Sequence, residues 1–230
     1  MRLEDVNQFL EPGYLPFETG YKRLENGQLH IGVLTRMPRC AGKMVDWWFG
    51  YAGDTKKYKL WHPTDHLVGD WDDLWKPGCY VGASHLVHEY IGKEICKLRI
   101  TFSEPSNFFD TSRFKEAGVT AAVCGRVGLL DEDKQLGYLI HFVRDTDYGC
   151  EMRSRFWLFD APDEFGRDLM THCIQDMGNL AGLLPDLYAK ETTKKLKKKA
   201  KKKPEKKPKK KPKNKKDKKI KKTNKKRKRK

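Results

Sequence analysis

The sequence predicts an α+β protein, in which antiparallel strands form a curved sheet and one long helix lies across it. The first observation is a run of strand-like segments between residues 97 and 159, and the second is a single long helical segment at residues 165–189. The third is their order, because strands that follow one another directly tend to pair and leave the helix to cover one face.

The strands are predicted from alternation and from turn residues. In residues 97–102 (KLRITF), Leu98, Ile100 and Phe102 alternate with polar side chains, which is the period-two pattern of a sheet with one wet face. The sequence TDYG predicts a hairpin turn between the last two strands. The remaining strand segments are residues 119–130, 135–145 and 150–159.

Composition divides the chain into three parts. Residues 1–43 are interrupted by proline and glycine, and we expect them to form a loosely structured N-terminal extension. Residues 44–191 contain the strands and the helix and predict one folded domain, large enough for a hydrophobic core. Residues 192–230 are dominated by lysine, with almost nothing apolar to bury, and predict a disordered tail.

The positive charge of the chain is concentrated in this tail. Residues 194–230 carry 26 of the 48 Lys and Arg residues but only Glu205 and Asp217 of the 31 acidic residues, so residues 1–193 have a net charge of −7. Such a tail could contact nucleic acid or an anionic surface without sequence preference, or act as a nuclear localisation signal. The acidic remainder lacks the basic stripe of a dedicated nucleic-acid-binding domain, so we interpret the tail as an address or anchor.

The cellular location is predicted from the cysteines and the apolar segments. The six cysteines are scattered without a C-x-x-C motif, which indicates reduced thiols rather than a disulfide framework. No apolar run reaches the ~18–20 residues of a membrane span, and the charged start MRLEDVNQ is not a signal peptide. We therefore expect a soluble intracellular protein, cytoplasmic or nuclear, with no transmembrane segment.

Two ionisable residues lie on the apolar side of the predicted helix. On a wheel of 100° per residue the apolar face is centred on Met170, and His172 and Asp176 fall on its shoulder among leucines. Burying both groups is costly unless a partner compensates. Either they hydrogen-bond each other or a strand, or they form half of a metal site, since imidazole nitrogen and carboxylate oxygen suit Zn²⁺.

The first half of the chain contains further donors that could complete such a site. In HLVHEYIG, alternation places His85 and Glu89 on one side of a strand and His88 on the other. His62 and His66 are four residues apart, which is a helical spacing. Because the proline at position 63 disfavours the helical conformation at His62, we do not expect the two histidines to share a helix.

Several aromatic-rich blocks in one order carry a family resemblance. DWWFGY precedes YKLWHPTDH, and these are followed by GCYVGASHLVHEYIG, GCEMRSRFWL and, ahead of LLPDLY, HCIQD. Across residues 40–190 this order resembles the 2,4-diacetylphloroglucinol hydrolase family, which includes phloretin-hydrolase-like enzymes. The resemblance implies a Bet v 1-like helix-grip fold, in which an antiparallel sheet wraps a long C-terminal helix around a cavity.

The resemblance also implies a zinc ion held by two histidines and two carboxylates. Carried over onto this sequence, the ligands are His66, Glu89, His172 and Asp176. The family has a glutamate at the position of Asp176, so the reach of this carboxylate is one methylene shorter. His62 is interpreted as a structural residue.

The implied activity is hydrolysis of the carbon–carbon bond between an acyl group and a polyhydroxylated aromatic ring, as in 2,4-diacetylphloroglucinol or phloretin. Zinc would polarise the acyl carbonyl or activate water. His141 and Tyr58 match positions that the family uses around its substrate, and we expect them to contact the aromatic ketone as catalytic residues. The alternatives are a satisfied buried histidine and a core tyrosine. Phe156 stands where the family places a tyrosine and predicts an aromatic wall that binds the substrate.

Two functions of other classes stay open. A helix-grip protein can bind small molecules without any chemistry, and the basic tail could itself be the functional part through contact with nucleic acid. Metal content discriminates between the hydrolase and the small-molecule carrier, because a hydrolase of this kind needs zinc and a carrier needs none.

Overall fold

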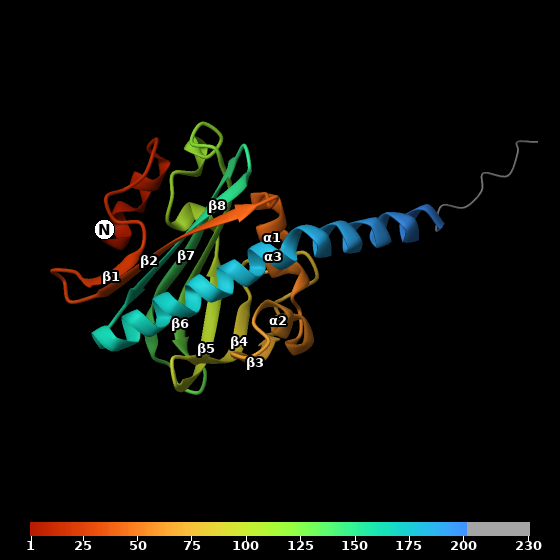
Figure 1. Ribbon diagram of the computed structural model, residues 1–230. Helices are drawn as coiled ribbons and strands as arrows, with labels where there is room; N and C mark the ends of the chain where they lie inside the picture. The colour runs from red at the N-terminus through yellow and green to blue at the C-terminus, as the bar shows by residue number, and fades with distance from the viewer. Residues whose placement is uncertain (202–230) are drawn as a thin grey trace, which may run out of the picture. The chain divides into compact units, whose positions relative to one another are not determined.

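One antiparallel sheet forms the body of the protein, and a long helix lies across it (Figure 1). The computed structural model describes residues 1–201. The sheet order is β1-β2-β8-β7-β6-β5-β4-β3, and every neighbouring pair is antiparallel, which confirms the predicted fold class. The strands are β1 (Gly20–Arg23), β2 (Leu29–Pro38), β3 (His66–Trp71), β4 (Ser84–Ile91), β5 (Glu94–Ser103), β6 (Val119–Leu129), β7 (Gln135–Thr146) and β8 (Gly149–Leu158).

Within residues 1–201 the helical segments lie before, between and after the strands. Three are α-helices, and α3 is by far the longest. Those are α1 (Gly42–Tyr51), α2 (Thr55–Trp61) and α3 (Asp163–Lys201), and the 3₁₀ segments are η1 (Leu3–Leu10), η2 (Pro105–Asn107) and η3 (Thr111–Arg113). None of the helices within residues 1–201 is long and apolar enough to cross a membrane.

Strands β4 to β8 form a continuous meander, as the alternating pattern predicts. Leu98 and Ile100 of β5 face the cavity beneath α3, and Phe102 is buried in the same core. The turn between β7 and β8 is a tight hairpin, because Thr146 pairs with Gly149 across two intervening residues. Inward-facing side chains on these strands therefore form one wall of the cavity.

The prediction of a loosely structured extension at residues 1–43 is wrong for β2. This strand pairs with β8 along its whole length, from Leu29 opposite Leu158 to Pro38 opposite Gly149. Moreover, the compact unit of the protein comprises Met1–Glu191. The period-two signal is missing because both faces of β2 are covered, so that its first five residues are all buried.

The N-terminal segment covers the outer face of the sheet, with η1 over β7 and β8 and with Phe17 and Glu18 over β2. Glu18 forms ion pairs with Arg155 at 2.6 Å and with Arg153 at 3.0 Å, and both arginines are buried. A second hydrophobic core lies on this outer face, separate from the core beneath α3. It contains Val6, Phe9 and Leu10 of η1 with Ile140, Phe142 and Trp157 of the sheet.

Helix α2 delivers the first histidine of the site to the start of β3. The Asp54 side chain caps α2 by accepting a hydrogen bond from the Lys57 amide at 2.9 Å. The helix ends at Trp61, and His62 is extended with φ −138° and ψ 93°. His62 and His66 therefore do not share a helix, as Pro63 predicts.

Helix α3 buries a face that is rotated from the one expected. Ile174 lies near the centre of the predicted apolar face but is 46 % exposed, whereas Cys173 and Leu180 are buried. His172 and Asp176 are also buried, so the face toward the sheet is centred closer to them. The helix is rotated in this way because His172 and Asp176 contact polar side chains across the cavity, His66 of β3 and Glu89 of β4.

Helix α3 also extends beyond the predicted start of the tail. It continues to Lys201, although we expected disorder from residue 192. Lysine is a good helix former and the first proline of the tail is Pro204, so nothing in the sequence ends the helix earlier. The predictions of disorder, nucleic-acid contact and nuclear localisation for the rest of the tail fall on residues 202–230, which lie outside the described part.

Candidate metal centre

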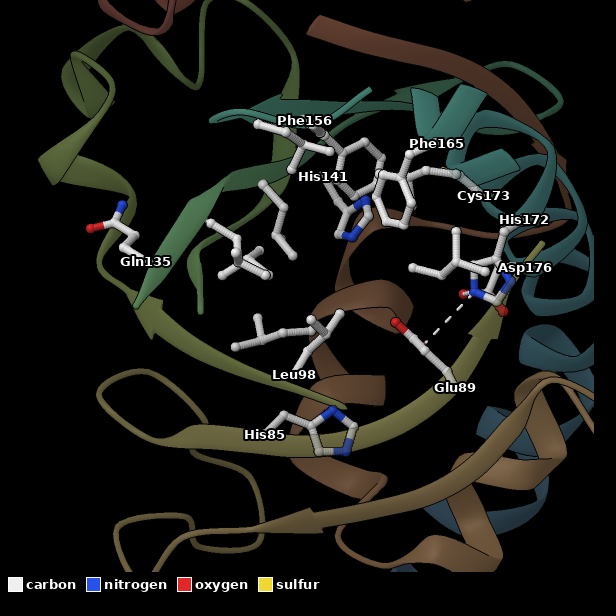
Figure 2. Close-up of a pocket in the computed structure, with 18 of the residues that line it drawn as sticks. His85, Glu89, Leu98, Gln135, His141, Phe156, Phe165, His172, Cys173 and Asp176 are labelled. Carbon is white, nitrogen blue, oxygen red and sulfur yellow. Dashed lines mark ion pairs between the residues drawn. The ribbon is translucent and has the colours of Figure 1, made fainter. Parts of the chain in front are cut away.

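A cavity of about 300 Å³ lies between the sheet and α3. Figure 2 shows Glu89 of β4 and His172 and Asp176 of α3 directed toward one another at one end, and His141 on another wall. The remaining walls are mainly apolar, and they include Leu98, Ile100, Phe102, Val127, Leu139, Phe156, Phe165 and Leu169. The structure thus joins a small polar end to a larger apolar space.

His66 is fully buried and has one nitrogen held by the backbone. Its Nδ1 lies 3.1 Å from the Tyr58 carbonyl oxygen, which can only accept, so Nδ1 carries the proton and donates. In the neutral imidazole the lone pair is therefore on Nε2, which is directed at the carboxylates of Asp176 and Glu89. This is the arrangement that a metal-binding histidine needs.

Tyr58 holds Glu89 and stacks on His66. Its hydroxyl donates to Glu89 Oε2 at 2.5 Å, and its ring lies 3.7 Å from the His66 ring at an angle of 4°. Burial and the Glu89 charge raise the pKa of Tyr58 well above its usual value, so the hydroxyl keeps its proton. A Cβ at Gly69 would approach the Tyr58 ring to 2.4 Å, so this close packing requires glycine there.

The two residues predicted on the helix reach the same point as His66 and Glu89. His66 Nε2 lies 3.2 Å from Asp176 Oδ1 and 3.6 Å from Glu89 Oε2. His172 Nε2 lies 3.8 Å from Asp176 Oδ2 and 3.9 Å from Glu89 Oε2. The shorter Asp176 carboxylate therefore still reaches the cluster.

The donor set fits a divalent metal ion. One ligand atom each of His66, Glu89 and His172 lies within 4.8 Å of the other two, and Asp176 adjoins both histidines. Asp176 Oδ1 and His66 Nε2 are buried 3.2 Å apart, and neither has a hydrogen bond to any other described residue, so a shared metal could bind both atoms. Burial lowers the pKa of His66, but Asp176 and Glu89 outweigh it and the net shift is upward. Two imidazoles and two carboxylates suit zinc.

Asp65 lies behind His172 and was not anticipated from the sequence. His172 Nδ1 donates to Asp65 Oδ2 at 3.4 Å, which leaves Nε2 directed at the cluster. His62 Nε2 lies 3.4 Å from the same oxygen, and His62 Nδ1 accepts from the Asp65 amide at 3.2 Å. Carboxylates commonly orient metal-binding histidines, but no sequence pattern pairs Asp65 with His172, which lies 107 residues later.

His62, Asp65 and His172 also form a group whose ligand atoms lie within 4.8 Å. This group shares His172 with the first cluster, and its Asp65 is only half-buried. An orienting role accounts for its geometry without a further ion, since each of its contacts fixes the proton position on one imidazole.

Replacing Asp65 with asparagine is expected to weaken zinc binding by about 10- to 100-fold, because the charged acceptor that orients His172 is exchanged for a neutral amide oxygen. Competition with a chromophoric chelator measures the affinity. Asp186→Asn is the matched control, since its side chain is 83 % exposed on the same helix as His172. Equal zinc affinity of Asp65→Asn and the wild-type protein would contradict the orienting role.

His141 lies on β7 with its ring inside the cavity wall. Its Nδ1 is 2.9 Å from Ser154 Oγ, and burial lowers its pKa to about 4, with Asp176 opposing the shift. Phe156 is buried beside it, with the two rings 6.1 Å apart and nearly perpendicular. Ser154 was missed, although it lies two residues before Phe156 and alternation places both on the inner face of β8.

Fold and site together define a helix-grip protein with a buried cluster of two histidines and two carboxylates at one end of an apolar cavity. Residues 1–162 match the family profile described as the DAPG hydrolase PhiG domain, DAPG being 2,4-diacetylphloroglucinol. This match covers most of the chain, so the protein belongs to the DAPG hydrolase family. His172 and Asp176 lie beyond the matched residues.

Individual relatives agree with this assignment. The chain is 24% identical over 223 residues to 2,4-diacetylphloroglucinol hydrolase of Pseudomonas protegens, covering 81% of this chain and 72% of the relative. It is 28% identical over 204 residues to phloretin hydrolase of Eubacterium ramulus, covering 75% of this chain and 72% of the relative.

Solved structures with the same architecture include plant proteins. Major latex-like protein 151 of Panax ginseng matches with a TM-score of 0.46 and 10% identity, covering 67% of this chain and 97% of that one. Ara h 8.0201 matches with a TM-score of 0.47 and 10% identity, covering 69% and 98%.

Proposed function

We propose that this protein is a metal-dependent hydrolase that cleaves the carbon–carbon bond between an acyl group and a polyhydroxylated aromatic ring. The observation that carries the proposal is the buried His66–Glu89–His172–Asp176 cluster, which opens into an apolar cavity in a chain of the DAPG hydrolase family. The names of its relatives suggest 2,4-diacetylphloroglucinol or phloretin as substrates.

The four residues of the cluster would hold the metal, and zinc suits their nitrogen and oxygen donors. When bound, zinc supplies a Lewis acid that polarises an acyl carbonyl or lowers the pKa of a water molecule. Tyr58 keeps Glu89 in place through its short hydrogen bond, and its stacked ring fixes the plane of His66. We therefore assign Tyr58 first to positioning the cluster and second to contact with the substrate.

The apolar walls would bind the aromatic ring and exclude water from it. Leu98 and Ile100 face the space from β5, and Phe156 offers an aromatic surface from β8. Phe156 has no hydroxyl, so it can contribute packing but no hydrogen bond to a ring hydroxyl. This placement leaves the acyl group directed at the cluster.

His141 would move a proton between a ring hydroxyl and the ring carbon. Hydrolysis adds the oxygen of water to the acyl carbon, and the electron pair of the broken bond passes to the ring, which then takes up a proton. Because burial keeps His141 neutral at pH 7, its imidazole can accept a phenolic proton and return it to carbon. Ser154 holds the ring in place through Nδ1.

Incubation of the full chain with 2,4-diacetylphloroglucinol in ¹⁸O-labelled water tests the proposal. We expect acetate that carries one ¹⁸O atom and monoacetylphloroglucinol without label, both detected by mass spectrometry. Phloretin is tested in the same way, with the aryl propionic acid as the labelled product. Turnover should stop after chelator treatment and return with zinc.

Two results would contradict the proposal. Binding of these ketones without any turnover, in protein that contains zinc, would indicate a carrier rather than a hydrolase. Turnover that survives complete removal of metal would retain the reaction but exclude the role given to the cluster.

A further inference from the structure

His85 is a buried histidine in the cavity wall to which the proposed chemistry gives no role. It lies on β4 four residues before Glu89, and the burial pattern of the strand turns both side chains inward. Both residues line the cavity, and Figure 2 shows His85 on β4 farther than Glu89 from His172 and Asp176. Only 4% of the His85 surface is exposed.

One ring nitrogen of His85 lacks a hydrogen-bond partner among the described residues. This nitrogen, Nε2, is buried. Burial and the nearby His66 lower the pKa of His85 to about 3, so the imidazole is neutral and offers one donor and one acceptor. A buried polar atom without a partner is destabilising, which indicates that a ligand supplies the missing contact.

Aromatic contacts hold the His85 ring in a fixed orientation. It stacks on Trp71 with a centroid distance of 4.4 Å and an angle of 17°, and it meets the edge of Tyr58 at 4.9 Å. These contacts explain why an aromatic ring is present, but phenylalanine would satisfy them equally. They leave the nitrogen atoms of a histidine unexplained.

The position of His85 matches the far side of a bound acylphenol. Four residues of a strand span about 13 Å between backbone positions, so His85 and Glu89 approach a ligand from opposite ends. An acyl group directed at Glu89 and His172 places the para position of the ring away from the cluster. The ortho hydroxyls then lie beside the acyl group.

We infer that His85 is a specificity-determining residue that hydrogen-bonds the ring hydroxyl para to the acyl group of the substrate. The inference rests on the proposed function, because the orientation of the ring follows from the acyl group at the cluster. It predicts that the cavity selects acylphenols of the phloroglucinol type over those that lack the para hydroxyl.

Two acylphenols that differ only in this hydroxyl test the inference. 2,4,6-Trihydroxyacetophenone and 2,6-dihydroxyacetophenone are titrated against the full chain by rapid-mixing tryptophan fluorescence, before turnover. We expect the wild-type protein to bind the first about 10- to 100-fold more tightly, because the second leaves His85 unpaired. His85→Phe, which retains the stacking, should bind both with the affinity that the wild-type protein has for the second.

Matched variants separate this role from a packing role. His88→Phe on the outer side of β4 should keep the preference, and His85→Gln, which retains a donor and an acceptor, should keep part of it. Undiminished preference in His85→Phe would overturn the inference. If His85→Phe does not fold, equal affinity of the wild-type protein for the two ligands overturns it without any variant.

The outcome is independent of the hydrolysis assay. Selective binding without turnover would remove the proposed function and leave the role of His85. Turnover without selectivity for the para hydroxyl would support the proposed function and exclude the role of His85.

Discussion

Replacing His172 with alanine is expected to lower kcat/KM for the acylphloroglucinol by at least ~1,000-fold, which corresponds to about 4 kcal/mol of transition-state stabilisation. His172 Nε2 is directed at both carboxylates of the cluster, so its loss removes one of four donors and weakens metal binding. Zinc content by elemental analysis should fall in parallel with the activity.

Gln175→Ala is the matched control for this variant, since Gln175 is exposed on α3 one turn from His172. It should leave both the zinc content and kcat/KM unchanged. A His172→Ala protein that is folded, retains one zinc per chain and remains fully active would exclude His172 as a ligand.

His141→Phe is expected to reduce kcat by about 100- to 10,000-fold while the zinc content stays that of the wild-type protein. Phenylalanine keeps the buried ring beside Phe156 but can neither accept nor return a proton. Because His141 has no contact with the four cluster residues in the structure, metal binding should not change. Steady-state kinetics combined with elemental analysis separates the two effects.

Ser154→Ala provides a graded comparison, because it removes only the hydrogen bond to His141 Nδ1. It should reduce kcat less than His141→Phe does. A larger loss of affinity than of kcat in His141→Phe would show that His141 binds the substrate without taking part in proton transfer.

The sequence predicts those parts of the fold whose two faces meet different surroundings. Strands β4 and β5 alternate because one face is turned to the cavity, whereas β6, β7 and β8 are long runs that are buried on both faces over most of their length. Helix α3 is evident from its length and its apolar residues. Strand β2 also lacks alternation, because Phe17 and Glu18 cover its outer face, and it lies in a part of the chain that is interrupted by proline and glycine. Such a strand is recognised only once its covering segment is known.

The site is predicted to a similar degree. His172 and Asp176 can be found on a helical wheel, because two ionisable groups among leucines require an explanation. Pairing them with His66 and Glu89 depends on the family resemblance, since the contact joins β3 and β4 to a helix that lies about 80 to 110 residues later. The roles of Asp65 and His85 require coordinates, because each depends on which nitrogen of an imidazole has a partner.

The measurement that most directly tests the metal-dependent mechanism is the metal content of the purified full chain, by elemental analysis after extensive dialysis against metal-free buffer. We predict about one zinc per chain in the wild-type protein, as one complete set of four ligands requires. An Asp176→Ala/His172→Ala double variant should hold almost none. Absence of any stoichiometric metal from a folded, wild-type protein that still hydrolyses acylphloroglucinols would contradict it.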